Sequence, residues 1–201
     1  GSRVLRGMGE VGMVGFSSVD TQRRRGLALL QLGFPAPVAL ETLIKVSNGA
    51  VQLSLIDRDG TPAAYSSPGL SHWAGSRTGL NYACGANTMV GPEVVQALGD
   101  TFEATEDSGL SLEERLLRCM EAAQATGGDN RGRQAAAIQV HWKRMDANAN
   151  LDIRVDDNPN PIPELRAAVK NYRELFPEYS NRTWPELTGT GGHKILYPGG
   201  W

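Results

Sequence analysis

The sequence is poor in the residues that build disulfides, metal sites and redox centres. It has only two cysteines in 201 residues, Cys84 and Cys119, and neither lies in a C-x-x-C pair or beside a metal-ligating residue. Its three histidines form no metal-binding pattern, and the sequence has neither a G-x-S-x-G nor an H-E-x-x-H motif. We therefore expect no metal and no cofactor. Cys119 lies in an amphipathic segment, where we expect it to be a small buried apolar residue.

Long apolar runs and an excess of one charge are also missing. No segment approaches the roughly 20 apolar residues of a membrane span, and the first ten residues lack the apolar core of a signal peptide. The formal net charge of −2 argues against a generic nucleic-acid surface. Two lone cysteines suit a reducing compartment. We expect a cytoplasmic protein that binds neither membranes nor nucleic acid.

The helix and strand patterns predict an α+β protein, with helices packed on mainly antiparallel sheet. Strand patterns alternate with pairs of helical patterns, which does not fit a regular series of β-α-β units. Asp59-Gly60 between two apolar runs is typical of a tight hairpin turn, and Ser111 and Glu114 have the spacing of a helix-capping box. The expected helices cover 25–33, 37–49, 91–105, 110–126 and 161–176, and the expected strands cover 9–19, 51–57, 61–67, two pieces of 73–89, 133–142 and 151–157.

Two motif matches are better explained without a ligand. Gly7–Gly12 has the letters G-x-G-x-x-G, but a dinucleotide site needs a strand before it and a helix after it, so we interpret it as a glycine-rich strand. The polar run Asp146–Asp157 has calcium-loop spacings. However, Leu151 stands where that loop needs glycine, and Asp157 stands where it needs glutamate. We interpret the run as a polar hairpin loop.

The strongest candidate site is GGDNRGRQAAAIQV, residues 127–140, in which Asp129, Arg131 and Arg133 precede an apolar strand pattern. A guanidinium offers a planar fork of donors that suits a carboxylate, so two of them at the mouth of a sheet would attract an anionic or carbonyl-rich ligand. The alternative is structural: the glycines end a helix, and the charged residues form local ion pairs. Another candidate, His72, is either a substrate-binding side chain or a structural hydrogen-bonding residue.

Three segments carry a family resemblance. GGDNRGRQAAAIQV, LDIRVDDNPNPIPELRAAV and ANTMVGPEVVQALGDTFEAT resemble motifs of the bacterial Ntn-hydrolase-like family known as domain of unknown function 1028, where Ntn stands for N-terminal nucleophile. The resemblance covers about residues 9–170. It implies a four-layer αββα sandwich over residues 1–176, followed by a Gly/Pro-rich tail over 177–201.

The resemblance also implies a chemistry. In active enzymes of that superfamily the first residue of the mature chain is Thr, Ser or Cys, whose side chain attacks a carbonyl while its α-amine acts as base. The implied reaction is hydrolysis of a small amide or another C–N bond. Ser2 is the candidate nucleophile if Gly1 is removed, and Asn87 is the candidate donor to the oxyanion. The motif match implies substrate binding by Asp129, Arg131, Arg133 and Gln134, with one arginine in direct contact and Asp129 orienting it.

The chain also departs from the family pattern. From the resemblance we expect it to start after the hairpin with which family members usually begin. Gly1 has no side chain to act as nucleophile, and Ala86 stands where the family usually has glycine. Asp156 and Asp157 match a family motif, but we interpret them as caps of the last helix.

Three functions therefore stay open. The first is an amidohydrolase acting on a small-molecule substrate. The second is a catalytically inactive binding or assembly module with the same fold, and the third is an enzyme of another reaction class using the same pocket. We expect a homodimer, because a strand left without its hairpin partner would expose an edge that needs cover.

Overall fold

The computed structural model describes residues 20–140 and 151–175. Its helices are α1 (Asp20–Gln31), α2 (Ala36–Lys45), α3 (Glu93–Ala104), α4 (Leu112–Ala125) and α5 (Pro161–Leu175). Its strands are β1 (Gln52–Ile56), β2 (Pro62–Ser66), β3 (Trp73–Gly79), β4 (Tyr82–Met89), β5 (Ala136–Val140) and β6 (Leu151–Val155). The predicted strand over 9–19, the candidate nucleophile Ser2 and the predicted tail over 177–201 lie outside the described residues.

Consecutive strands form antiparallel pairs, β1 with β2, β3 with β4 and β5 with β6, which confirms the α+β prediction. The turn between β1 and β2 is organised by Asp57, whose Oδ1 accepts the backbone N–H groups of Asp59 and Thr61 at 3.1 and 2.9 Å. Its Oδ2 accepts the N–H of Ala36 at the start of α2, at 3.0 Å. Gly60 has a φ of 80°, which explains the glycine in this turn.

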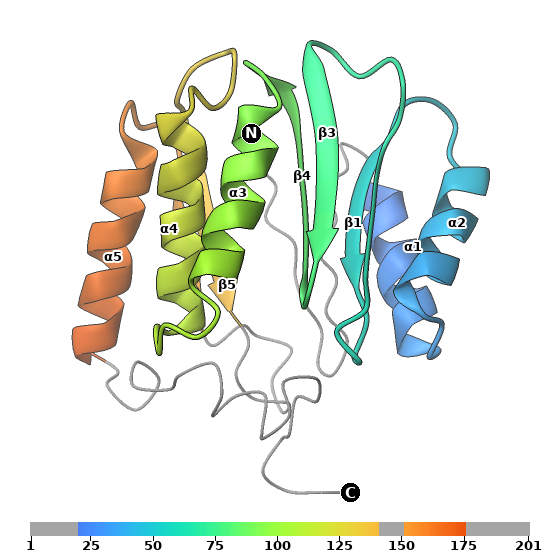
Figure 1. Cartoon of the computed structure of the whole chain (residues 1–201), viewed down its shortest axis with the longest axis horizontal. Coiled ribbons are helices and arrows are strands. Elements are labelled where there is room, and N and C mark those ends of the chain that lie inside the picture. The colour runs from blue at the N-terminus through green and yellow to red at the C-terminus, as the bar shows by residue number, and fades with distance from the viewer. Residues whose placement is uncertain (1–19, 141–150, 176–201) are drawn as a thin grey trace, which may run out of the picture.

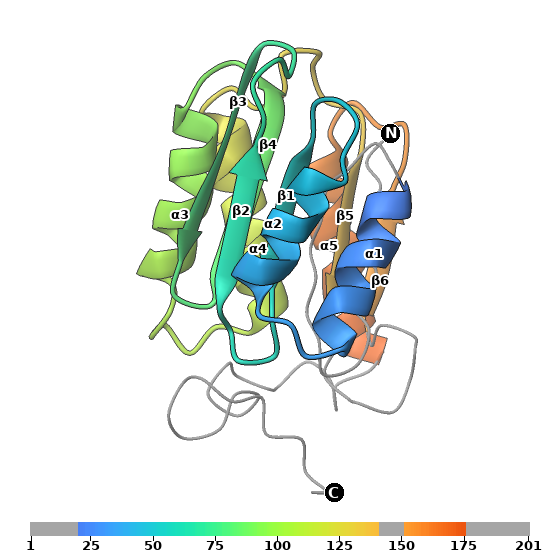
Figure 2. The same cartoon turned by 90° about the vertical axis from the view of Figure 1, so that its right-hand side faces the viewer.

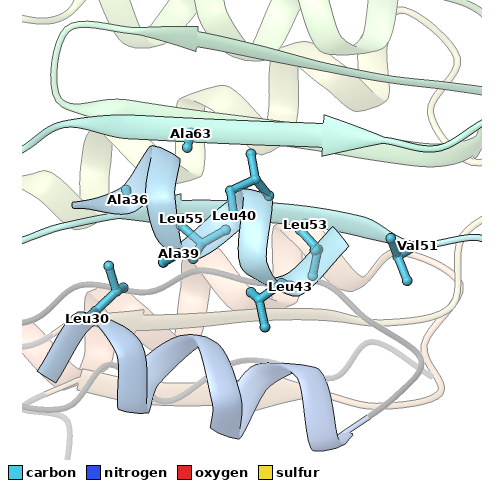
Figure 3. Close-up of a cluster of buried hydrophobic side chains, with 9 residues drawn as sticks. All are labelled: Leu30, Ala36, Ala39, Leu40, Leu43, Val51, Leu53, Leu55 and Ala63. Carbon is cyan, nitrogen blue, oxygen red and sulfur yellow. The ribbon is translucent and has the colours of Figure 1, made fainter. Parts of the chain in front are cut away.

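The strand pairs lie between two groups of helices, α1 and α2 on one side and α3 to α5 on the other (Figure 1). Figure 2 shows α2 lying over β1 and β2. Leu53 and Leu55 of β1 belong to the same buried cluster as Leu40 and Leu43 of α2 (Figure 3). The alternate residue Gln52 points the other way and donates to backbone carbonyls of β3 and β4. Both faces of β1 are therefore covered, one by helix and one by the second strand pair.

The predicted capping box is wrong. Ser111 is the N-cap of α4 but makes no side-chain capping hydrogen bond, and its hydroxyl accepts a hydrogen bond from Arg173 of α5. Glu114 pairs with Arg118 and with Arg166 of α5. Arginines of α5 therefore engage both side chains, Ser111 by a hydrogen bond and Glu114 by an ion pair. For Glu114 the reason is that a carboxylate gains more from a guanidinium than from a neutral backbone N–H.

The remaining predictions for single elements are close to the structure. Helix α1 begins at Asp20, before the predicted residue 25, and α2 ends at Lys45, before the predicted residue 49. Cys119 is a buried member of a cluster with Tyr82 and Phe102, as predicted. Burial raises the pKa of its thiol to about 11, so the thiol stays protonated at neutral pH.

Candidate functional site

A cavity of about 390 Å³ opens where segments far apart in the sequence meet. One side of the cavity is formed by β1 and β4, and we call it the strand wall. It consists of Gln52 and residues 85–87 and 89. We call the opposite side the loop wall, formed by Gln124, residue 129, residues 131–135 and the start of α5. The polar and charged side chains that carry the argument are Gln52, Asn87, Asp129, Arg131, Arg133 and Gln134.

The two walls are joined by backbone hydrogen bonds. The N–H of Asn130 donates to the Thr88 carbonyl at 2.8 Å, and the N–H of Val90 donates to the Gly128 carbonyl at 3.2 Å. Gly127 and Gly128, which follow α4, have φ values of 117° and 70° and supply the turn that brings Asp129 back to β4. The structural interpretation of this segment is confirmed, since its glycines follow the end of a helix and Asp129 pairs with Arg131. Its charged residues also line a cavity, and ligand binding there stays a prediction.

The strand wall is centred on the buried amide of Gln52, which is 4% exposed. Its Nε2 lies within donor distance of Ser66 Oγ at 2.9 Å, the Ala86 carbonyl at 2.7 Å and the Gly75 carbonyl at 3.3 Å. Its Oε1 accepts a hydrogen bond from Asn87 Nδ2 at 2.8 Å. Because two carbonyls can only accept, they fix which end of the Gln52 amide faces them, and this in turn fixes the Asn87 amide.

Asn87 keeps donor capacity for a ligand. Its Oδ1 accepts the hydroxyl of Thr88 at 3.1 Å, and Gln52 takes one of the two hydrogens on Nδ2. Within the described residues the second hydrogen has no acceptor.

The backbone beside Asn87 is strained. Thr88 has a φ of 61°, in the left-handed region that β-branched residues rarely adopt. It is buried, and its carbonyl accepts the N–H of Asn130, so the loop wall holds it in this conformation. Such outliers cost about 1–3 kcal/mol and gather at binding and catalytic sites, so the strain at Thr88 favours a functional role for this cavity.

On the loop wall, Asp129 and Arg131 form a closed pair. Arg131 Nε and Nη2 donate to Asp129 Oδ1 and Oδ2 at 2.9 and 2.5 Å, and the Arg131 backbone N–H donates to Oδ1 at 2.8 Å. The hydrogen bond from the Arg131 side chain is the main cause that lowers the pKa of the Asp129 carboxyl, and the same contact raises the pKa of Arg131. Both charges are therefore permanent at neutral pH and largely neutralise each other.

Arg133 is arranged differently. It is exposed, and within the described part of the chain its one side-chain hydrogen bond is from Nη1 to Asn160 Oδ1 at 3.3 Å. No carboxylate among the described residues pairs with it. Of the two arginines that the sequence left as alternatives, Arg131 is engaged within the protein and Arg133 has donors to spare.

Comparisons with known proteins define the family. The model of a family of unknown function, DUF1028, matches residues 1–165, which is most of the chain. The chain belongs to this family. No curated protein matches it. The crystal structure of protein SPO2555 from Silicibacter pomeroyi, assigned to DUF1028, is similar to the chain with a TM-score of 0.74 and 22% sequence identity. The match covers 97% of this chain and 86% of that one, and at this identity it shows a shared fold.

Five of the seven predicted site residues line the cavity of this protein: Asn87, Asp129, Arg131, Arg133 and Gln134. His72 does not line it. Its Nδ1 lies 3.3 Å from the side-chain nitrogen of Asn130, next to the loop wall. Ser2 lies outside the described residues. Asp156, interpreted as a helix cap, pairs with Arg154 instead, and an asparagine, Asn158, accepts the N–H of Asn160 before α5.

Sequence reasoning missed Gln52. The only signal was that Gln52 and Ser54 alternate with Leu53 and Leu55, which puts the polar pair on the face opposite the leucines. The local sequence pattern of a strand does not distinguish a polar face that lies in water from one that is buried against another sheet.

Within residues 20–140 and 151–175, no three or more His, Cys, Asp and Glu side chains form a group that could hold a metal ion. No helix in these residues combines the length and apolar character needed to cross a membrane.

Proposed function

We propose that this DUF1028 protein is an Ntn-type amidohydrolase that cleaves a small amide or another C–N bond in the cavity. The observation that carries the proposal is the Asn87 amide. It is fixed by the buried Gln52, it precedes the strained Thr88, and it keeps an N–H group on a cavity that Arg133 also lines. The position of the strand pairs between two groups of helices supports the Ntn-hydrolase sandwich (Figure 1).

The proposed reaction has two steps. The hydroxyl or thiol of the first residue of the mature chain loses its proton to the chain's own α-amine and attacks the carbonyl carbon. The carbonyl oxygen becomes an oxyanion, which Asn87 Nδ2 stabilises by donating a hydrogen bond. The C–N bond then breaks, and the amine leaves with the proton that the α-amine held. Water hydrolyses the acyl intermediate in the second step. Ser2, after loss of Gly1, is the candidate nucleophile.

The loop wall would select and orient the substrate. Arg133 would bind it directly, and Gln134 would add a neutral amide contact. Asp129 would act indirectly, because its pairing with Arg131 holds the shape of the loop beside Arg133.

The first experiment determines the N-terminus. The protein is expressed without a tag from its natural reading frame, and its intact mass and N-terminal sequence are measured. A mature chain starting with Thr, Ser or Cys is expected, and this chain is then assayed against a panel of small amides for release of ammonia or amine.

Variants connect any activity to the cavity. Asn87→Ala is expected to lower kcat by about 10²–10³-fold, the usual loss when one oxyanion donor is removed. Gln139→Ala is the control, since that amide lies on β5, outside the cavity, and pairs with Asp152. Ligand binding without turnover by a chain with a verified nucleophile would favour the inactive binding module. Turnover by a chain that starts with glycine would favour another reaction class.

A further inference from the structure

The charged side chains that line the cavity do not cancel one another. Of the described side chains that line it, three are charged: Asp129, Arg131 and Arg133. Asp129 and Arg131 are bound to each other through both carboxylate oxygens, so they contribute little net field. One positive charge, that of Arg133, is left without a carboxylate in the described part of the chain.

The rest of the polar lining is neutral and consists of amides. Gln52 and Asn87 stand on the strand wall, and Gln124 and Gln134 stand on the loop wall. Gln52 is engaged within the protein, but the other amides can still donate or accept, so they suit a ligand with amide or carbonyl groups without attracting further negative charge. Among the described residues, one guanidinium without a carboxylate partner beside neutral amides therefore indicates a ligand with a single negative charge.

We infer that the cavity binds a small amide that carries one carboxylate, with the carboxylate on Arg133 and the amide carbonyl toward Asn87. This inference rests on the proposed function, which identifies the amide C–N bond as the bond that reacts. The inference adds the class of substrate. A guanidinium binds a carboxylate through two parallel hydrogen bonds, which fixes the substrate's direction as well as its position. Such a fixed carboxylate would hold the amide carbonyl near Asn87 for attack.

The same charge balance disfavours a phosphate ligand. A phosphate group carries a charge of about −1.5 to −2 at neutral pH and offers three strong acceptor oxygens. It is usually met by several cations or by a run of backbone N–H groups. The cavity offers one uncompensated arginine. Its border on α5 has Pro161 and Pro163 at two of the first three helical positions, and proline has no N–H to donate.

The test measures binding and turnover separately. Wild-type protein is titrated by calorimetry with N-acetylglycine and N-acetylglutamine, each beside its neutral C-terminal amide and beside inorganic phosphate. The acids are expected to bind at least about tenfold more tightly than their amides, the size of one charge-assisted bidentate contact. Equal binding of acid and amide, or tighter binding of phosphate, would overturn the inference.

Variants locate the carboxylate. Arg133→Gln is expected to abolish the preference for the acid, and Arg133→Lys is expected to keep only part of it, because an ammonium retains the charge without the fork. Arg118→Gln is the matched control, since Arg118 is half exposed and pairs with Glu114 on α4, outside the cavity. The melting temperature of Arg133→Gln is expected to stay at the wild-type value. A preference that survives in Arg133→Gln would overturn the assignment.

The titrated samples are then assayed for released acetate. Preference for the acid without release would sustain the carboxylate site while the proposed hydrolysis fails. Hydrolysis of acid and amide at equal rates and affinities would sustain the hydrolysis while the carboxylate site fails.

Discussion

The two walls of the cavity are stabilised in different ways. On the strand wall, Gln52 is buried and its amide is engaged by Ser66, Gly75, Ala86 and Asn87. On the loop wall, the charged side chains are more exposed, and one closed ion pair lies beside an arginine with free donors. Buried polar groups that lose their partners cost much more than exposed ones. The strand wall is therefore the part that holds its shape, and the loop wall is the part that can change its contacts when a ligand arrives.

The largest expected effect on stability comes from Gln52→Leu. This change keeps the side-chain size but leaves the Ala86 and Gly75 carbonyls and the Asn87 amide without their partner. Each unsatisfied buried group costs about 1–3 kcal/mol, so we expect a loss of about 3 kcal/mol in the free energy of unfolding, measured with urea. Gln124→Leu makes the same chemical change on the loop wall, where the amide has one 3.4 Å contact to Gly127, and should cost less than about 1 kcal/mol. Equal losses would remove the contrast between the walls.

A smaller effect tests the strain at Thr88. Thr88→Ala and Thr88→Gly both remove the hydroxyl that donates to Asn87, so the difference between them reports the backbone alone. In an ordinary strand glycine is the less stable of the two by roughly 0.5–1 kcal/mol. At a φ of 61° we expect the order to reverse, with Thr88→Gly more stable than Thr88→Ala by about 1 kcal/mol. If the alanine variant is the more stable one, the loop wall does not impose the left-handed conformation.

An effect of similar size at neutral pH concerns Asp129, and it disappears in acid. Asp129→Asn removes the charged acceptor of Arg131 and should cost about 1 kcal/mol at pH 7, as for a partly exposed ion pair. The folded protein lowers the pKa of this carboxyl, so its contribution is present above the unfolded value of about 3.9 and is lost as the pH falls through the lower, folded value. Urea unfolding of both proteins between pH 7 and pH 2 should therefore show the difference shrink in acid.

The control for that series is Asp156→Asn, which breaks a more exposed pair with Arg154 and should change stability by less than about 0.5 kcal/mol. A difference between wild type and Asp129→Asn that stays constant down to pH 2 would mean that the Arg131 contact does not stabilise the fold.

Local signals were enough to predict most of the elements. The apolar runs around Leu53 and Leu55 and the turn at Asp59-Gly60 gave the β1–β2 hairpin, because a hairpin depends on neighbouring residues. The capping box failed for the opposite reason. Ser111 and Glu114 are taken by arginines of α5, far along the chain, and no local pattern reports such partners.

The same limit applies to the site. The sequence predicted the charged cluster at 129–134, and the family motif indicated Asn87. The sequence did not show that Asp129 would pair with Arg131 while Arg133, within the described residues, would keep donors beyond its hydrogen bond to Asn160, since this depends on the turn that the chain makes there. It gave no reason to choose Gln52, whose partner Asn87 is 35 residues away. The importance of Gln52 depends on the packing of two strand pairs.

Because the cavity is assembled from β1, β4, the end of α4, the 129–135 segment and the start of α5, it exists only while all of these segments are folded together. Any molecule that occupies it must therefore bind the folded chain and not the unfolded one. Mass action then raises the free energy of unfolding, by about 2.7 kcal/mol at a ligand concentration of 100 times Kd. The thermal stability of the protein therefore reports ligand binding directly. A rise in melting temperature across a collection of small acids and amides would identify ligands before any reaction has been observed.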